Sequence, residues 1–240
     1  MTMPSSAMVL AAGLGTRMRP LTNDRPKPLI EVAGKPLIDY ALDRFAEAGV
    51  EQAIVNVHYL AQMIEDHLGE RENPEIIISD ERELLLETGG GLKKARPHFS
   101  GDAVFCTNTD AILVDGNGRE PCELLSNTFD PKRMDALLLI VPIRETSGYD
   151  GAGDVDLAPD GQLSFRTGDS ASFVFTGLQI ISTELLDDAP EGPFSTKHLW
   201  DQAAAKGRLF GVIHEGFWMH VGDPEGLETA KARLTNKDVC

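Results

Sequence analysis

The chain has 240 residues, of which 42% are hydrophobic, and it carries a formal net charge of −16 at pH 7. This length and composition allow a large buried core, and we expect a single α/β domain with additions. The negative charge argues against a general nucleic-acid-binding surface and against an acidic-membrane surface, because phosphate groups would be repelled at long range.

A phosphate-binding loop is predicted near the amino terminus. Residues 8–12 form an apolar run typical of a buried strand, and the loop that follows contains Gly13, Gly15, Thr16, Arg17 and Lys27. Glycines let the backbone approach an anion closely, and cations add charge-assisted hydrogen bonds to phosphate oxygens. The alternative is a surface turn whose charges are only solvated.

Two better-known phosphate loops do not match this segment. A dinucleotide-binding fingerprint requires a third glycine near Met18 and an immediate helix, whereas Arg17, Arg19 and Pro20 stand here. A Walker A loop ends in Gly-Lys-Ser or Gly-Lys-Thr, and the chain contains neither triplet. The segment therefore argues against a dinucleotide-dependent oxidoreductase.

Strands and helices alternate after this loop. Helical periodicity is found in residues 36–48 and 60–68, and strand-like apolar runs are found in residues 52–57 and 75–78. This alternation predicts βαβ units and a mainly parallel sheet, in which ligands bind at the carboxyl ends of the strands.

Three consecutive glycines, residues 89–91, precede another predicted helix that contains Lys93 and Lys94. Such glycines let the backbone approach a flat or anionic ligand at the start of a helix. On these residues alone, a flexible turn is equally well supported.

A further strand is predicted over residues 103–110, and it carries Asn108 and Asp110 at its carboxyl end. A carboxylate at this edge faces the predicted phosphate loop and is suited to bind Mg²⁺ as a hard oxygen ligand. A strand-end aspartate can equally form an Asx turn or cap a helix.

The amino-acid composition changes at Thr146, after which the chain becomes rich in glycine. Before it we expect a helix over residues 121–129 and a buried strand over residues 134–143, and after it a hairpin over residues 155–166 with an Asp-Gly turn. We expect this hairpin to form a small sheet added over the nucleotide-binding half, where a sugar would sit.

A strand over residues 172–181 comes next, interrupted at Thr176-Gly177. Glycine within a strand marks a bulge or a close approach to a ligand. The last predicted elements are a helix over residues 194–206, strands over residues 209–214 and 217–221, and a helix over residues 225–234.

The cysteines and the amino terminus bear on the compartment. Cys106, Cys122 and Cys240 are odd in number and lack Cys-x-x-Cys spacing, which disfavours a disulfide framework and a zinc site. Residues 1–7 lack the pattern of a signal peptide, and the longest apolar run, residues 136–141, is too short to span a bilayer. We therefore expect a cytoplasmic protein with no membrane partner.

The segment Leu10-Ala-Ala-Gly-Leu-Gly-Thr-Arg17, followed by Pro20, Thr22 and Pro26-Lys-Pro28, resembles the signature of the sugar-1-phosphate nucleotidyltransferases. Weaker similarity extends along nearly the whole chain. The resemblance implies an α/β fold with a Rossmann-like, mainly parallel (mixed) sheet flanked by helices and a small added β-sheet over the sugar site. It divides the single domain, residues 1–240, into a nucleotide-binding half (1–145) and a sugar-binding half (146–240).

The resemblance also implies roles for individual residues. Arg17 would stabilise the β- and γ-phosphates and the departing pyrophosphate, Lys27 would neutralise charge at the α-phosphate, and Asp110 would hold Mg²⁺. The other nucleotide-binding candidates are Ala11, Ala12, Gly13, Gly15, Thr16, Glu87, Thr88, Gly89, Gly90 and Asn108, and the sugar-binding candidates are Asp154, Thr176 and Gly177.

The chain departs from the family pattern near its last strand. Many members have Trp-x-Asp-Val/Thr-Gly-Thr, whose aspartate is a second metal ligand, whereas His220 occupies that position here and Asp223 stands where threonine is usual. Imidazole is a poor first choice for Mg²⁺. Three possibilities follow: His220 binds the metal through water, Asp223 replaces the missing ligand, or Asp223 caps the final helix.

The expected reaction is the Mg²⁺-dependent joining of a nucleoside triphosphate and a sugar 1-phosphate to give a nucleotide sugar and pyrophosphate. UTP and N-acetylmuramic acid 1-phosphate are the favoured pair. The alternatives are a guanylyltransferase that uses GTP and mannose 1-phosphate, and a catalytically inactive nucleotide-sensing regulatory homologue. We expect no nucleic-acid partner, and a monomer or a small homo-oligomer.

Overall fold

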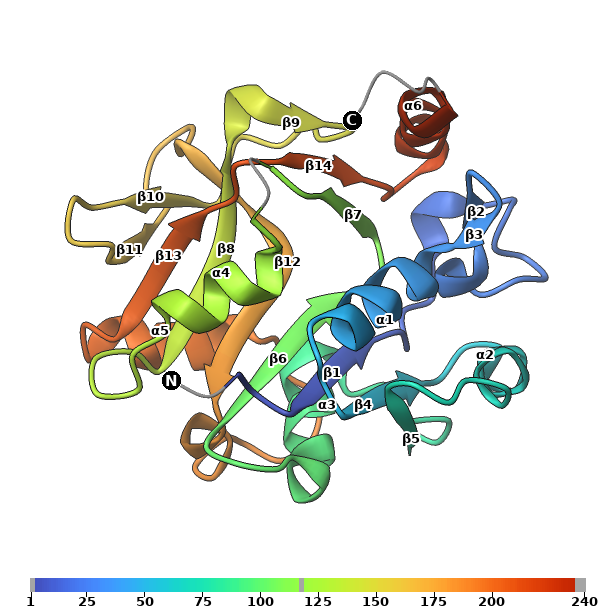
Figure 1. The fold of residues 1–240 in the computed structure, drawn as a ribbon, viewed down its shortest axis with the longest axis horizontal. Helices are drawn as coiled ribbons and strands as arrows, with labels where there is room; N and C mark the ends of the chain where they lie inside the picture. The colour runs from blue at the N-terminus through green and yellow to red at the C-terminus, as the bar shows by residue number, and fades with distance from the viewer. Residues whose placement is uncertain (1–2, 117–118, 236–240) are drawn as a thin grey trace.

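A mixed nine-stranded sheet runs through the described part of the chain, residues 3–116 and 119–235 of this computed structural model (Figure 1). Its backbone order is β5-β4-β1-β6-β12-β8-β13, and the hairpin β10-β11 joins it at β12. The strands are β1 (Ser6–Leu10), β4 (Gln52–Val57), β5 (Glu75–Asp80), β6 (Ala103–Asn108), β8 (Ala136–Pro142), β10 (Val155–Leu157), β11 (Leu163–Phe165), β12 (Phe173–Ser182) and β13 (Leu209–Ile213).

The parallel part of the sheet determines where the site can form. β1 pairs in parallel with both β4 and β6, and β4 pairs in parallel with β5, so the carboxyl ends of these strands meet at one edge. The register sets Leu10 beside Asn56 on one side and beside Asn108 on the other. Side chains that follow these strands therefore converge, as the alternation of strands and helices predicts.

β12 is antiparallel to β6 and to β8, which makes the sheet mixed. The register between β12 and β8 shifts between Phe175 and Gln179, and Gly177 within this irregularity has a φ of 98°. This left-handed conformation favours glycine, so the bulge predicted at Thr176-Gly177 is confirmed.

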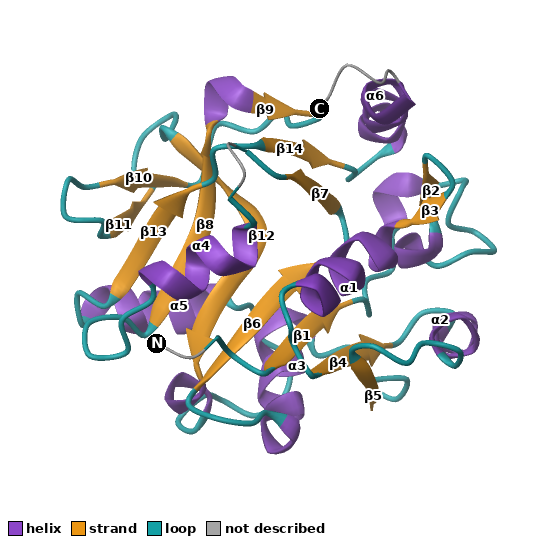
Figure 2. Ribbon diagram, viewed as in Figure 1, coloured by secondary structure: helices purple, strands orange, loops and turns teal. Residues whose placement is uncertain are grey.

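Helices cover both faces of the sheet (Figure 2). Side chains alternate along each strand, so Val9 joins a core cluster with residues of α1, α2 and α4, whereas Met8 joins a cluster with residues of α3 and α5. α1 ends before Gly49, whose φ of 79° is typical of a helix C-terminus. The helices are α1 (Leu37–Glu47), α2 (Ala61–Leu68), α3 (Glu87–Ala95), α4 (Pro121–Thr128), α5 (Lys197–Ala205) and α6 (Pro224–Thr235).

A second, three-stranded sheet consists of β7 (Ala111–Val114), β14 (Phe217–His220) and β9 (Thr146–Ser147). It lies above the carboxyl edge of the main sheet in the view of Figure 1, and α6 packs on it through Met219 and Leu227. A short pair, β2 (Glu31–Val32) and β3 (Lys35–Pro36), precedes α1.

Two sequence-based expectations about local structure are wrong. The predicted hairpin at residues 155–166 forms, but it extends the main sheet instead of making the added sheet, because the first half of β12 projects beyond β6 and offers its edge to β10. The three glycines do not precede a helix: Gly89, Gly90 and Gly91 lie inside α3 and are buried.

Two features of the chain need only brief mention. Cys106 and Cys122 are buried and unpaired, and Cys240 lies outside the described residues. Within residues 3–116 and 119–235, none of the helices combines the length and the apolar character needed to cross a membrane.

Candidate active site

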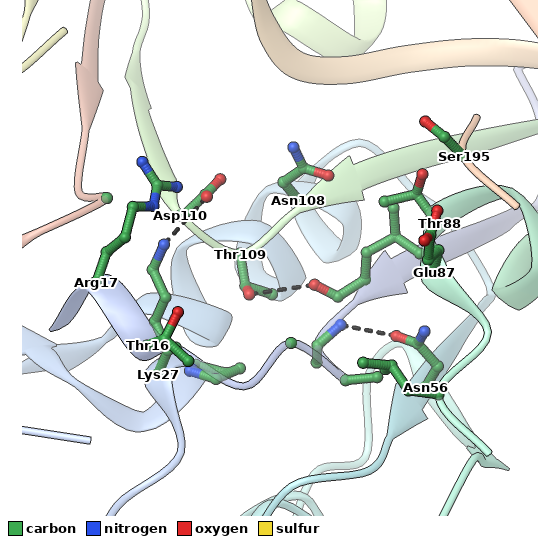
Figure 3. A pocket seen from close by; sticks show the side chains of 18 residues that line it. Thr16, Arg17, Lys27, Asn56, Glu87, Thr88, Asn108, Thr109, Asp110 and Ser195 are labelled. Atoms are coloured by element: carbon green, nitrogen blue, oxygen red, sulfur yellow. Dashed lines mark hydrogen bonds and ion pairs between the residues drawn. The ribbon is translucent and has the colours of Figure 1, made fainter. Parts of the chain in front are cut away.

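A pocket of about 460 Å³ opens where β1, β4 and β6 end (Figure 3). It is lined by the loop after β1, by the start of α3 and by the residues that close β6. The structure brings together in it a large set of the residues predicted from the sequence: Ala11, Ala12, Gly13, Gly15, Thr16, Arg17, Lys27, Glu87, Thr88, Asn108 and Asp110.

The loop after β1 owes its shape to Gly15 and Thr22. Gly15 has a φ of 60°, and a Cβ atom there would meet Cγ2 of Thr22 at 3.0 Å. The Thr22 hydroxyl donates a 2.8 Å hydrogen bond to the Gly15 carbonyl, which fixes the loop. The short 3₁₀ turn η1 (Thr16–Met18) follows, and Arg17 within it has no ion-pair partner among the described residues. Its guanidinium is exposed at the pocket and free to meet an anion.

Lys27 and Asp110 meet at the left of the pocket in Figure 3, joined by a dashed line. The Lys27 Nζ lies 3.0 Å from Oδ2 of Asp110, and Nε2 of His220 lies 3.7 Å from the same oxygen. Burial would raise the pKa of Asp110, but the contact with His220 and the charge of Lys27 outweigh it and hold that pKa well below its usual range. Asp110 is therefore an ionised carboxylate at neutral pH.

The opposite end of the pocket is formed by the start of α3 and the segment before α5. Glu87 has a φ of 59°, rare for a residue with a side chain, and it lines the pocket with Thr88 and Ser195. Gly89 and Gly90 do not line it. Their N–H groups donate to the Phe194 carbonyl at 2.8 and 3.1 Å, so these glycines hold the segment before α5 against the helix.

A smaller cavity of about 100 Å³ adjoins the first and shares Asn108 and Asp110 with it. It is lined by the three predicted sugar-binding residues and by aromatic rings. The Asp154 carboxylate accepts a 2.9 Å hydrogen bond from the N–H of Phe175. The Thr176 hydroxyl donates instead to the Leu139 carbonyl inside the sheet, so Thr176 faces the cavity without offering that group.

Two residues were candidates for the second metal ligand, and the structure places them differently. His220 lines the small cavity beside Asp110, and its Nδ1 lies 3.3 Å from the Gly148 carbonyl. Asp223 accepts a 2.9 Å hydrogen bond from the N–H of Gly226, so it caps α6 and lines neither cavity.

Magnesium is usually held in nucleotide sites by one or two carboxylates together with phosphate oxygens and waters. No group of three or more His, Cys, Asp or Glu side chains within residues 3–116 and 119–235 is arranged to hold a metal by itself. Among the residues that the structure describes, Asp110 is the carboxylate that lines both cavities, and it is ionised. This set fits a magnesium ion whose other ligands come from the substrates.

Several residues at the site were missed by the reasoning from sequence. Asn56, Thr109 and Ser195 line the larger pocket, and Tyr149 and Trp218 line the smaller one. Asn56 is the last-but-one residue of a strand that was predicted, so a polar residue near the carboxyl end of β4 was a usable signal. No local pattern marks Ser195, because it reaches the pocket only through the packing of residues 192–196 on α3.

Comparison with known proteins gives the following relatives. Residues 6–155 match the family described as nucleotidyl transferase. The chain is 50% identical over 236 residues to an N-acetylmuramate alpha-1-phosphate uridylyltransferase from Caulobacter vibrioides, and the match covers 96% of this chain and 97% of that protein. It is 34% identical over 229 residues to a protein of the same name from Neisseria meningitidis, with 94% of this chain and 96% of that protein covered.

Among solved structures, a putative glucose-1-phosphate thymidylyltransferase from Bacillus anthracis in complex with a sucrose superposes with a TM-score of 0.81. The superposition covers 97% of this chain and 96% of that one at 15% sequence identity. At this identity the likeness shows a shared fold.

Proposed function

The chain belongs to the nucleotidyl transferase family, and from this membership we propose that it joins UTP to N-acetylmuramic acid α-1-phosphate. An oxygen of the sugar phosphate forms a bond to the α-phosphorus of UTP. The bond from that phosphorus to the oxygen bridging to the β-phosphate breaks, and pyrophosphate leaves. The other product is the uridine diphosphate sugar.

The observation that carries the choice of substrates is the 50% identity, over nearly the full length of both chains, to the Caulobacter vibrioides uridylyltransferase. The geometry agrees with a two-substrate reaction, because two adjoining cavities share Asn108 and Asp110. The larger cavity is suited to the nucleotide and the smaller one to the sugar. Both cavities draw residues from before and after residue 145, so the two substrates would be held across the proposed halves of the domain.

The side chains at the left of Figure 3 are suited to a reaction that needs positioning and charge neutralisation rather than proton transfer. A sugar phosphate is already a competent nucleophile. Lys27, held beside Asp110, would neutralise negative charge at the α-phosphate, and the unpaired guanidinium of Arg17 would bind the β- and γ-phosphates and the departing pyrophosphate. Neither residue has to move a proton in this scheme.

We infer that Asp110 would hold Mg²⁺ together with substrate oxygens. The ion would supply Lewis-acid polarisation of the phosphates and a template that orients them. Asp110 is ionised and lines both cavities, which is what a ligand shared by two phosphate groups requires. His220 lies beside this carboxylate, with its Nε2 3.7 Å from Oδ2, and lines the smaller cavity with it.

The test is pyrophosphate release by the purified protein with MgCl₂, measured for UTP, GTP, CTP and TTP, each paired with N-acetylmuramic acid 1-phosphate, N-acetylglucosamine 1-phosphate and mannose 1-phosphate. UTP with N-acetylmuramic acid 1-phosphate should give the highest kcat/KM, by about a hundredfold over GTP with mannose 1-phosphate. The opposite ranking would make the protein a guanylyltransferase.

A catalytically inactive nucleotide-sensing homologue is distinguished by measuring the thermal midpoint beside pyrophosphate release. A nucleotide-sensing homologue would show a rise in thermal midpoint with a triphosphate but no pyrophosphate release with any pair of substrates.

The role of Asp110 is tested with Asp110→Asn, which keeps the shape of the side chain and removes its charge. It should abolish Mg²⁺-dependent turnover, whereas Asp115→Asn, at the exposed ion pair with Arg44, should retain it.

A further inference from the structure

A chain of hydrogen bonds between two buried polar side chains lies beneath the nucleotide pocket, where β4 and β5 end. It consists of Asn56, the last-but-one residue of β4, and Glu81, which directly follows β5. Both side chains are almost completely buried, with 2% and 1% of their surface exposed. A buried glutamate is costly unless its oxygens are hydrogen-bonded, so its partners show what it stabilises.

The two side chains connect two separate loops of the pocket. Oδ1 of Asn56 accepts a 2.7 Å hydrogen bond from the N–H of Ala11, the first residue of the phosphate loop, as the dashed line in Figure 3 shows. Nδ2 of Asn56 donates to Oε1 of Glu81 at 2.8 Å. The other carboxylate oxygen of Glu81 accepts from the N–H of Leu86 at 3.0 Å, directly before Glu87.

The hydrogen-bond partners allow only one orientation of the Asn56 amide between Ala11 and Glu81. The N–H of Ala11 can only donate, so it requires the amide oxygen of Asn56, and the amide nitrogen is then directed to Glu81. Both side-chain partners of Glu81 are donors, so each of its two oxygens acts as an acceptor. No cationic side chain within residues 3–116 and 119–235 forms an ion pair with Glu81. The two side-chain oxygens of Glu81 therefore accept from an amide and from a backbone N–H at the amino end of α3.

The third glycine of the triplet belongs to the same arrangement. A Cβ atom on Gly91 would lie 2.9 Å from Nδ2 of Asn56 and 2.9 Å from Oε1 of Glu81. Glycine at this position lets α3 pass directly over the hydrogen bond between the two side chains. Gly91 therefore serves the packing of α3 on Asn56 and Glu81, whereas Gly89 and Gly90 contact the segment before α5.

We propose that Asn56 and Glu81 are positioning residues that set the phosphate loop and the Glu87 loop at a fixed separation, so that one triphosphate engages both. Neither side chain need touch the reacting phosphates for this role. Ala11 fixes where the phosphate loop leaves β1, and Leu86 fixes the entry to the left-handed conformation of Glu87. The identity of the nucleotide, UTP, rests on the proposed function, whereas the coupling of the two loops does not.

An exchange of the two functional groups tests this proposal. Glu81→Gln places an amide NH₂ against one of two donors, and Asn56→Asp places two carboxylates against each other, so each single variant loses a hydrogen bond. The double variant Asn56→Asp with Glu81→Gln restores every bond: the new aspartate accepts from Ala11 and from the new glutamine, whose amide oxygen accepts from Leu86.

Three measurements distinguish a loss of loop positioning from a loss of overall protein stability. Each single variant should bind UTP with Mg²⁺ about tenfold more weakly by calorimetry, raise the KM for UTP and leave kcat within about threefold, and the double variant should return to within about threefold of wild type. Amide hydrogen exchange of the free protein should rise in the single variants at residues 11–17 and 85–90 and fall back in the double variant. The control is Gln179→Leu, which removes the partly buried hydrogen bond donated by Trp200 Nε1, and both residues lie outside the two cavities. It should lower the thermal midpoint and leave the KM for UTP unchanged.

The proposal is overturned when Glu81→Gln binds UTP within about threefold of wild type. It is also overturned when the double variant folds but stays as weak as the single ones. The double variant carries the test even where a single variant is too unstable to assay. A wild-type protein that releases no pyrophosphate would refute the proposed function, while the exchange of the ligand-free protein would still decide the coupling of the loops.

Discussion

Lys27 and Asp110 are 83 positions apart in the chain, yet the lysine Nζ lies 3.0 Å from Oδ2 of the aspartate. The Lys27 side chain is only 12% exposed. It starts from the short 3₁₀ turn η2 (Lys27–Leu29), which Pro26 precedes and Pro28 stiffens. A cation held in this way loses little conformational entropy when a phosphate arrives. The ion pair therefore holds the ammonium proposed to face the α-phosphate and the carboxylate proposed to bind Mg²⁺ at a fixed separation.

Replacement of Lys27 by methionine should lower kcat by about 10²–10³-fold, because a preorganised cation at a developing charge is worth that much in a water-poor site. Methionine keeps the apolar stem and removes only the ammonium. Steady-state pyrophosphate release measures the effect. Arg25→Met is the matched control, since Arg25 pairs with Glu31 at 3.8 Å on the surface and should change kcat by less than about twofold. A Lys27→Met enzyme within a few-fold of wild type would remove Lys27 from the mechanism.

The small cavity should govern the sugar phosphate alone. Asp154 accepts a 2.9 Å bond from the N–H of Phe175 and lines that cavity, whereas Asp156 accepts a 2.9 Å bond from the N–H of Ser172 and does not. Asp154→Ala should therefore raise the KM for the sugar phosphate about tenfold and leave the KM for UTP within about twofold. Asp156→Ala removes a similar bond and should alter neither KM. Equal effects of the two variants on the sugar phosphate would contradict the assignment of this cavity.

Much of this fold could be predicted because its signals are local. The helix that became α1 is marked by an apolar period, a proline before it and a glycine after it, and its predicted bounds differ from the observed ones by one residue at each end. Asn108 and Asp110 were found because a strand that delivers polar residues at its carboxyl end is recognisable in one dimension.

The structural features that could not be predicted from the sequence depend on contacts between segments that are far apart in the chain. The burial of Gly89 and Gly90 follows from the fit of residues 192–194 against α3, where a Cβ atom on Gly89 would lie 2.4 Å from the Phe194 ring. β7 was not predicted because Ala111–Val114 is short and becomes a strand by pairing with β14, which follows it by about a hundred residues. Ser195 reaches the pocket in the same indirect way.

Ser195 offers a test of base selectivity. Its hydroxyl oxygen accepts a 3.2 Å bond from the N–H of Lys197, so its own hydrogen remains for a ligand in the pocket shared with Glu87. A donor there favours a base edge that carries a carbonyl oxygen, such as O4 of uracil. Ser195→Ala should lower kcat/KM for UTP by about three- to tenfold and that for CTP by less, as measured in parallel assays.

The control for Ser195 is Ser182→Ala. Ser182 accepts a 3.4 Å bond from the N–H of Glu184 in the same kind of local motif, but it lies outside both cavities. It should leave the UTP-to-CTP ratio at its wild-type value. An unchanged ratio in Ser195→Ala as well would mean that this hydroxyl does not read the base.

His214 predicts how stability depends on pH. It is 1% exposed, and its Nε2 faces the carbonyl oxygens of Val114 and Phe217 at 3.1 and 3.3 Å, so this nitrogen carries a hydrogen. Burial lowers the pKa of His214 below the ordinary 6.5 and outweighs the carbonyls, which act to raise it. The unfolded chain therefore binds a proton at a higher pH than the folded protein does.

The sign of the pH dependence follows from that difference. The contribution of neutral His214 to the free energy of unfolding is fully present above pH 6.5 and is lost as the pH falls through the lowered pKa of the folded state. Urea unfolding at about pH 7.5 and about pH 5 should show this loss in the wild type and a smaller loss in His214→Gln. Glutamine can still donate to the two carbonyls, but it does not titrate in this range. Equal losses in the two proteins would mean that the protonation of His214 does not contribute, and that other groups set the acid sensitivity of the fold.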